Sequence, residues 1–208
     1  MTFRQCAAFL VIAAIVTASP VMAQDVRSDK KRSRLHELSS VSLKGDARSA
    51  FRRFKRKARY YGAFYANPAE QVAGAYWDAS NIETADSVAR AACESNSRDP
   101  WGCVLVARVL PKDYDPERTG LTLSRKGNKE FREYTRLQAE DRFGAFAMSE
   151  NGAVGYSWAE ASQFTAEREA LKRCEKAVRK LLRRTPDHMQ DAISNPGNKT
   201  CRIVHRAG

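Results

Sequence analysis

The sequence predicts an α+β fold made of two β-β-α-β repeats, in which small antiparallel sheets are packed by helices and each repeat holds one disulfide. Three observations support this prediction: an internal duplication, a hairpin-then-helix pattern in each copy, and cysteines at matching places in the two copies. An internal repeat is considered first because it decides how the other segments are interpreted. The two repeats are expected at 60–111 and 142–208.

The duplication consists of residues that recur in the same order in both copies. Gly62-Ala63-Phe64 matches Gly144-Ala145-Phe146, and the alignment continues after a one-residue gap in the following turn. The further equivalent pairs are Gly74 and Gly155, Trp77 and Trp158, Ala85 and Ala166, Ala89 and Ala170, Cys93 and Cys174, and Cys103 and Cys201. Recurrence of Gly, Trp and Cys in one order indicates two copies of one unit.

Each copy begins with a predicted hairpin. In the first copy, short runs of aromatic and small apolar residues at 60–66 and 72–77 flank a turn that contains Asn67-Pro68. In the second copy the turn contains Asn151-Gly152, a pair that tolerates the positive φ of hairpin turns. Two runs of this kind around a tight turn predict paired antiparallel strands.

A helix and a final strand are expected after each hairpin. Apolar residues recur at helical spacing in both copies, and Ser80 with Glu83 predicts a capping box at the start of the first helix. A β-branched run then closes each copy, at 103–109 and at 201–204. The order within each unit is therefore strand, strand, helix, strand.

Residues 1–23 have the three zones of a removable secretion signal. Arg4 is the only charge, an apolar run follows at 7–16, and small residues lead to Val21-Met22-Ala23. A membrane anchor is the alternative, but the apolar run is shorter than the roughly 20 residues that a spanning helix needs. We therefore expect a secreted or periplasmic protein with no transmembrane segment after cleavage.

Cysteine usage agrees with an oxidising compartment. Cys6 lies in the predicted signal, and the other four cysteines form an even set, which in an exported chain favours disulfides over metal binding. Four cysteines permit three pairings. Because each copy would have needed its own bridge before the copies were joined, the repeat predicts Cys93–Cys103 and Cys174–Cys201.

Three segments lie outside the repeats and the signal. Residues 24–44 are polar, basic and rich in Ser and Lys, which predicts a disordered basic arm. The range 45–59 is predicted as an amphipathic basic helix, and 112–141 as a connector with a short helix. Phe51 and Phe54 mark the apolar face of the amphipathic helix, which can either pack on the core or lie in a membrane surface.

The composition indicates an anionic partner. The chain has 36 Lys and Arg against 24 Asp and Glu, a formal net charge of +12. Because an exported protein meets little nucleic acid, the expected partner is an anionic envelope component or an acidic protein; a basic surface that is merely solvated is the alternative. The cations expected to bind lie on the helix of the second repeat: Arg168, Lys172, Lys176, Arg179, Lys180 and Arg183. They are predicted to lie opposite an apolar face of Phe164, Leu171, Val178 and Leu182.

Two tryptophans occupy equivalent positions at the ends of the predicted hairpins. Trp77 and Trp158 each stand just before a helix, with Tyr76 or Tyr156 close by in sequence. Such a pair can form a binding platform for a sugar or peptide, or can cover the strand-helix junction. Both interpretations stay open at this level.

The second copy resembles a known family. The phrase from Gly144 to Cys174, GAFAMSENGAVGYSWAEASQFTAEREALKRC, is similar to a bacterial secreted domain named domain of unknown function 4189. The first copy departs from it at Ala75-Tyr76, where the second copy has Tyr156-Ser157. The resemblance implies a bacterial exported protein with a disulfide in each unit, and it lends no catalytic residues.

The sequence offers few candidates for catalysis. His36, His188 and His205 are scattered, and no Cys-x-x-Cys or helical His pair predicts a metal site, so neither a triad nor a cofactor is expected. The alternative function is an enzyme acting on an envelope polymer through carboxylates near the tryptophans. The candidate carboxylates are Asp78, Glu150, Glu160 and Glu167. Glu167 also fits the acid-rich first turn of a helix.

The predicted signal makes one outcome directly measurable. Signal peptidase cuts after small residues, so the exported protein is expected to begin at Gln24. N-terminal sequencing of protein recovered outside the cytoplasm measures the site of cleavage. Exported protein that begins at Met1 would contradict the prediction.

Overall fold

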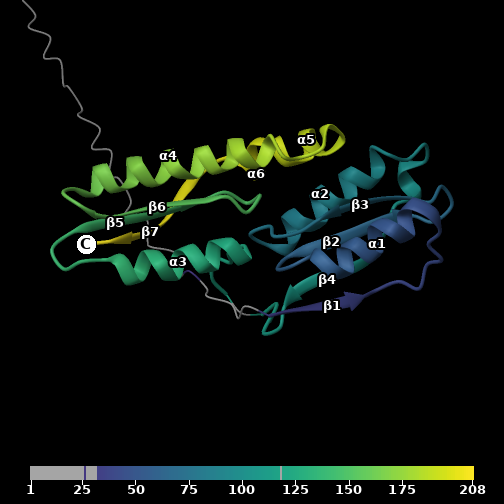
Figure 1. Cartoon of the computed structure of the whole chain (residues 1–208), viewed down its shortest axis with the longest axis horizontal. Coiled ribbons are helices and arrows are strands. Elements are labelled where there is room, and N and C mark those ends of the chain that lie inside the picture. Colours follow the sequence, from purple (N-terminus) through teal and green to yellow (C-terminus); the bar gives the residue numbers. More distant parts are fainter. Residues whose placement is uncertain (1–25, 27–31, 118) are drawn as a thin grey trace, which may run out of the picture.

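The computed structural model describes residues 26, 32–117 and 119–208. The predicted signal at 1–23 and its cleavage site lie outside these described residues. Within the described part of the chain, no helix is both long and apolar enough to span a membrane. The fold is α+β, with two antiparallel sheets that each lie between helices (Figure 1).

The first half of the chain forms a four-stranded sheet in the order β1-β4-β2-β3. Its strands are β1 (Ser33–Glu37), β2 (Gly62–Asn67), β3 (Val72–Tyr76) and β4 (Val104–Pro111). Helix α1 (Gly45–Lys57) covers one face and α2 (Ile82–Glu94) covers the other, and a 3-10 turn, η1 (Pro100–Gly102), leads into β4. Strands β1 and β3 are therefore the two edges of this sheet.

The second half repeats this plan with three strands in the order β6-β5-β7. The strands are β5 (Phe143–Met148), β6 (Val154–Glu160) and β7 (Arg202–Ala207). Helix α3 (Arg125–Leu137) packs on one face and α4 (Gln163–Leu182) on the other, followed by α5 (Asp187–Ser194) and α6 (Pro196–Lys199). Here β6 and β7 are the edges.

The alternation of side chains along the central strands explains why each sheet needs two helices. Ala63 faces the cluster built on α2, whereas its neighbour Phe64 faces the cluster built on α1. In the second repeat Ala145 faces α4 and Phe146 faces α3 in the same way. In both pairs the alanine meets the helix within the repeat, and the phenylalanine meets the helix that precedes it.

The predicted strand-strand-helix-strand order and both predicted disulfides are confirmed. Cys93 and Cys103 are joined with an S–S distance of 2.02 Å, and Cys174 and Cys201 with one of 1.98 Å. Closing loops of these lengths is worth roughly 3 kcal/mol each in the chain-entropy model. Each bridge ties a helix to the start of the strand that completes its sheet, from the last turn of α2 in the first half and from the middle of α4 in the second.

Two local predictions are wrong. The composition of 24–44 predicts a disordered basic arm, but β1 within it pairs with β4 from Ser33↔Pro111 to Glu37↔Ala107. Its polar sequence hides the strand because most of β1 is exposed and only Leu35 packs on the core. Helix α2 is capped by Asn81, whose side chain accepts from the Thr84 N–H, and not by Ser80.

The apolar face of α1 is occupied inside the protein. Phe54 is fully buried, and the Phe51 ring lies 5.0 Å from that of Phe64 in β2. The sequence left two roles open for this helix, packing on the core and lying in a membrane surface. Its aromatic side chains pack on the core. The Lys and Arg side chains on the rest of α1 remain exposed.

Two equivalent glycines let the helices approach the edge strands closely. A Cβ on Gly74 of β3 would lie 2.2 Å from the Ala89 carbonyl oxygen and from the Cys93 nitrogen of α2. A Cβ on Gly155 of β6 would lie 2.2 Å from the Cys174 nitrogen of α4. These contacts are with backbone atoms, which cannot rotate away.

We expect Gly74→Ala and Gly155→Ala each to lower the free energy of unfolding by about 3 kcal/mol, because overpacking of this kind forces the helix off its strand. Gly197→Ala is the matched control, since its added Cβ would meet nothing closer than 3.5 Å. Urea denaturation measures all three. Equal stability of the three variants would show that the helices are not in close contact with β3 and β6.

Candidate functional site

Edge strands β3 and β6 border three neighbouring cavities that share lining residues. A cavity of about 420 Å³ is lined by β3, α1 and the segment from α4 to α5. A second cavity of about 390 Å³ shares Tyr76, Trp77 and Arg184 with the first. A third, also of about 390 Å³, shares Lys126 with the second and runs along β6. We call the three together the edge groove.

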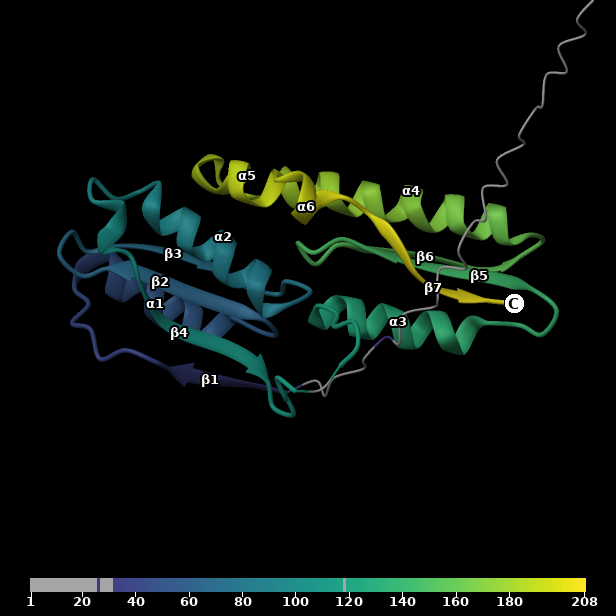
Figure 2. The same ribbon diagram turned by 180° about the vertical axis from the view of Figure 1, so that it is seen from behind.

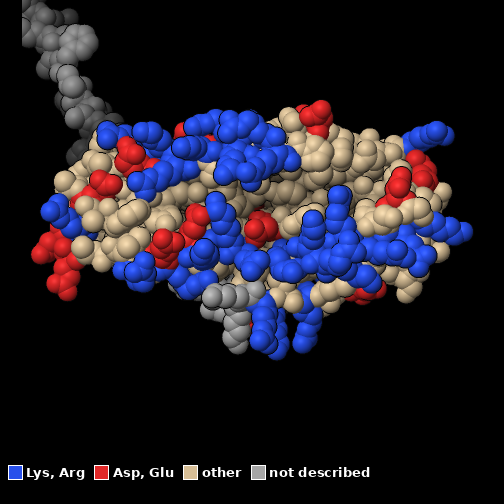
Figure 3. All heavy atoms as spheres, viewed as in Figure 1, with Lys and Arg blue, Asp and Glu red and all other residues tan. Residues whose placement is uncertain are grey.

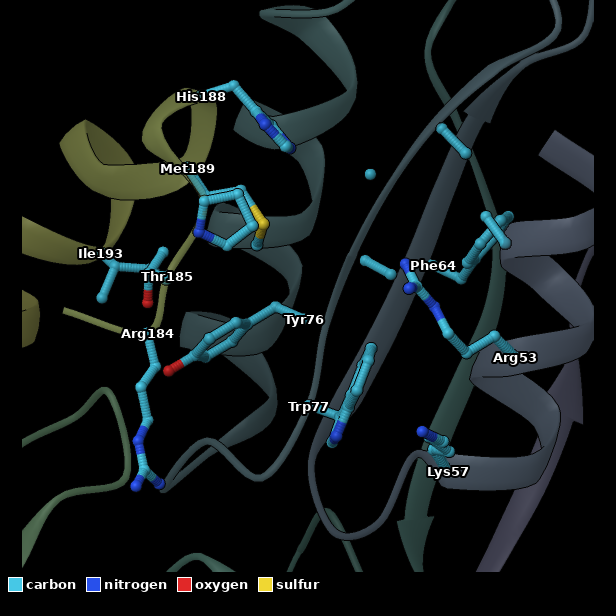
Figure 4. A pocket seen from close by; sticks show the side chains of 15 residues that line it. Arg53, Lys57, Phe64, Tyr76, Trp77, Arg184, Thr185, His188, Met189 and Ile193 are labelled. Carbon is cyan, nitrogen blue, oxygen red and sulfur yellow. The ribbon is translucent and has the colours of Figure 1, made fainter. Parts of the chain in front are cut away.

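The first cavity has cations on both sides and small residues along β3. Figure 4 shows Arg53 and Lys57 on α1 at one side, and Arg184 and His188 at the other, with Trp77 between them. Ala73, Gly74 and Ala75 supply the strand itself. Because these side chains are small, the main chain of β3 lies near the surface of the cavity.

The central cavity lies where the two repeats meet. The Tyr76 hydroxyl donates to the Asn151 carbonyl oxygen at 2.7 Å, which joins the end of β3 to the turn between β5 and β6. The Asp78 carboxylate accepts from the Arg125 N–H at 2.7 Å, at the start of α3. Lys126, Lys180 and Arg184 also line this cavity.

Asp78 is held in an unusual environment for a carboxylate. Its backbone has a φ of 63°, a region in which a residue other than glycine is uncommon. Desolvation by burial raises the pKa of this carboxyl, and the N–H groups at the start of α3 oppose that effect. Desolvation is the larger effect, so the folded protein favours the protonated form more than the unfolded chain does.

The third cavity presents an aromatic surface. Trp158 is 36% exposed, and its ring lies 5.6 Å from that of Tyr156. The guanidinium of Arg173 lies 5.4 Å from the centre of the Trp158 ring, and it donates to the Tyr156 carbonyl oxygen at 2.7 Å. Glu130 and Glu133 line the same cavity, and Glu130 pairs with Lys126 at 3.2 Å.

Cations predominate along the edge groove. They are Arg53, Lys57, Lys126, Lys129, Arg173, Lys180 and Arg184, against the carboxylates Asp78, Glu130 and Glu133. Figure 3 shows Lys and Arg gathered in one band over α4 and another over α1 and α3, with mostly uncharged surface and a few Asp and Glu side chains between the bands. The groove thus lies between two positive rims.

The six cations predicted on α4 are all exposed, and one of them contributes to the groove. Lys180 lines the central cavity. Arg168 and Lys172 each lie within 4.0 Å of Glu169, and Arg179 lies 4.0 Å from Glu175, so part of their charge is offset on the helix. Lys176 and Arg183 are exposed along α4.

The predicted apolar face of α4 is partly wrong. Val178 is buried and Leu171 and Leu182 are half-buried, as expected. Phe164 is 73% exposed, and the guanidinium of Arg168 lies 5.6 Å from its ring centre. Phe164 stands in the first turn of the helix.

The two tryptophans line the groove but differ in exposure. Trp77 is half-buried and meets the Phe54 ring edge-on at 6.2 Å, so it covers the strand-helix junction of the first repeat. Trp158 is more exposed and stands beside Arg173. Trp77 therefore has the covering role, and a binding role for Trp158 stays a prediction.

The four candidate carboxylates have separate partners. Glu150 pairs with Arg202 at 2.6 Å, and Glu167 with Arg206 at 2.7 Å. Glu160 accepts from the Ser157 hydroxyl, and Asp78 accepts from the start of α3. Glu167 stands beyond the first turn of α4, which contains no acidic residue, so its predicted dipole role is wrong. Its pKa is lowered mainly by Arg206.

The three histidines lie in different parts of the fold and form no cluster within the described residues. His188 lines the first cavity, whereas His205 bonds the Tyr134 hydroxyl at 3.1 Å and burial lowers its pKa. His36 is exposed on β1. Within 32–117 and 119–208, no group of three or more His, Cys, Asp or Glu side chains is placed to hold a metal ion.

Sequence reasoning missed most of the groove. The basic runs were visible, but the convergence of Arg53 and Lys57 with Arg184 depends on how α5 docks on the first repeat. Lys126 was not singled out, because α3 was predicted only as a short helix. The residues of β3 that line the first cavity include no charged side chain, so nothing in the sequence indicated a binding surface there.

Comparison with known protein families, with curated proteins and with solved structures finds no match for this chain in any of the three.

Asp78 supplies a test of this geometry through pH. A folded-state pKa above the ordinary value means that unfolding releases a proton between the two pKa values, so the stability contributed by this group grows as the pH falls through that window. We expect the free energy of unfolding of the natural protein, minus that of Asp78→Asn, to increase between about pH 7 and pH 4. Urea denaturation across this range measures the difference. A difference that shrinks on acidification would show that hydrogen bonding to α3 dominates instead.

Proposed function

We propose that this protein is an exported, non-enzymatic binding protein that holds an anionic envelope component or an acidic protein partner in the edge groove. The disulfides in each half support export, because structural disulfides are typical of proteins that fold in oxidising compartments. Secretion or periplasmic residence, a bacterial source and membership of domain of unknown function 4189 belong to the same proposal. The supporting features for that family are the repeated Gly, Trp and Cys positions.

The single observation that carries the binding role is the placement of cations from separate elements along one groove. Arg53 comes from α1, Lys126 from α3 and Lys180 from α4, and all three side chains are exposed. Neighbouring like charges repel, so their convergence costs free energy that an anionic ligand would offset. If the basic surface served only solubility, the cations would not need to lie along the edge groove.

The shape of the site favours a polyanion over a flat membrane surface. The aromatic side chains of α1 pack inside the protein, so the helix has only its charged side left for a partner. The exposed cations therefore act through charge, and the groove between them fits an elongated ligand. Contact with a membrane surface would engage the rims and leave the floor of the groove empty.

Charge reversal tests the proposal. We expect Arg53→Glu, Lys180→Glu and Arg184→Glu, combined in one variant, to remove retention on immobilised heparin, a model polyanion, at salt concentrations where the natural protein is retained. Exposed charges are screened over roughly 8–10 Å at ordinary ionic strength, so the natural protein should elute as salt is raised. The measurement is the salt concentration at elution.

A matched control separates the groove from overall charge. Arg34→Glu, Lys112→Glu and Lys199→Glu change the net charge by the same amount, at exposed positions on β1, after β4 and on α6. We expect this variant to elute close to the natural protein. Equal loss of retention in both variants would mean that net charge alone is responsible, and would remove the support for a binding groove.

A further inference from the structure

The four sheet edges of this protein differ in a way that bears on its ligand. Strands β1 and β7 are the outer edges, and β3 and β6 are the edges that border the groove. An edge strand presents unpaired N–H and C=O groups that pair readily with another chain, and proteins commonly block them with charged residues. The sequences of the four strands show which edges are blocked.

The outer edges carry charged residues along their length. Arg34 and Glu37 are exposed on β1, and Arg202 and Arg206 lie on β7. By contrast, β3 reads Val-Ala-Gly-Ala-Tyr and β6 begins Val-Gly-Tyr-Ser, with Glu160 only at its last position. Strand β3 thus lacks the protection that the outer edges have, and on β6 the Tyr156 carbonyl oxygen already accepts from Arg173 at 2.7 Å.

We infer that the edge groove binds an extended acidic polypeptide segment, which adds as a strand to β3 and β6. This inference rests on the proposed function and names its ligand class. The main chain of the edge strands would supply hydrogen bonds, as in other cases of strand addition, and the rims would supply charge complementarity. The cavity beside Ala73 and Ala75 leaves room for a second backbone at the edge of β3, whereas Gly74 is packed against α2.

The two rims fit the geometry of a strand. Successive side chains of a strand point to opposite faces of its sheet. A strand added to β3 or β6 would direct one set of side chains toward α1 and α3, where Arg53, Lys57 and Lys126 lie. The other set would point toward the C-terminal end of α4 and the residues just after it, where Lys180 and Arg184 lie. Acidic residues at both odd and even positions would therefore meet cations.

Charge also argues against a second copy of this chain as the occupant. The chain has a formal net charge of +12, and the rims of the groove are themselves basic. Pairing two such edges would bring like charges together along the whole contact. An acidic segment meets no such opposition.

The test uses a labelled peptide of about nine residues built from Glu and Thr, with Glu at odd and even positions. Its partner probe is the same peptide with the central amides N-methylated, which keeps every charge and removes the hydrogen-bond donors on both edges. We expect the methylated peptide to bind the intact protein at least about tenfold more weakly, because several net-favourable hydrogen bonds are lost. Fluorescence anisotropy measures both affinities.

Amide hydrogen exchange provides the second readout. Binding of the unmethylated peptide should slow exchange in Val72–Tyr76 and in the first residues of Val154–Glu160, and leave β1 unchanged. Equal affinity of both peptides, or protection confined to the helices, would overturn strand addition while leaving an electrostatic binding groove intact. Protection of β3 that appears with rising protein concentration alone would assign the edge to a second copy. If the natural protein neither binds the unmethylated peptide nor is retained on heparin, the proposed function is overturned as well.

Discussion

The docking of the second hairpin turn on the first repeat is the interaction on which the site depends. Ser80 donates its backbone N–H to the Glu150 carbonyl at 3.0 Å and its hydroxyl to the Ser149 carbonyl at 2.9 Å. Tyr76 reaches the neighbouring Asn151 carbonyl at 2.7 Å, and the Ser124 hydroxyl reaches Gly152. These groups are buried, so each would be costly to leave without a partner. Their mutual satisfaction joins two separate sheets and brings β3 and β6 to one groove.

A second contact closes the groove at its far end. Helix α5 belongs to the second repeat by sequence, but Met189 and Ile193 pack into the core cluster of the first, beside α2 (Figure 2). That position carries Arg184 and His188 to the edge of β3. The extra length between Cys174 and Cys201 is what permits this, because the corresponding loop of the first repeat closes after a sequence separation of 10 rather than 27.

The sequence predicts the parts of this structure that depend on local pattern and on the duplication. Repeated Gly, Trp and Cys positions are sufficient for the strand order and for both disulfides. Strand β1 could not be predicted, because its polar residues owe their conformation to pairing with β4 rather than to their own pattern. The role of Ser80 could not be predicted either, because its hydroxyl bonds the second repeat while Asn81 caps the helix. The groove was missed for this reason: its residues are brought together by docking, which no local spacing encodes.

The basic rims and the unblocked edges have complementary physical effects. An uncharged edge strand would ordinarily invite pairing with other copies of the chain, which is the usual route to aggregation. Here Arg53, Lys57 and Arg184 stand beside β3, so a second copy brings its own cations against them. The charge that repels copies is the same charge that attracts an acidic segment, and at higher salt both effects weaken together. The rims can therefore protect the edge and select its partner, whereas β1 and β7, with charge on the strand itself, are protected without being selective.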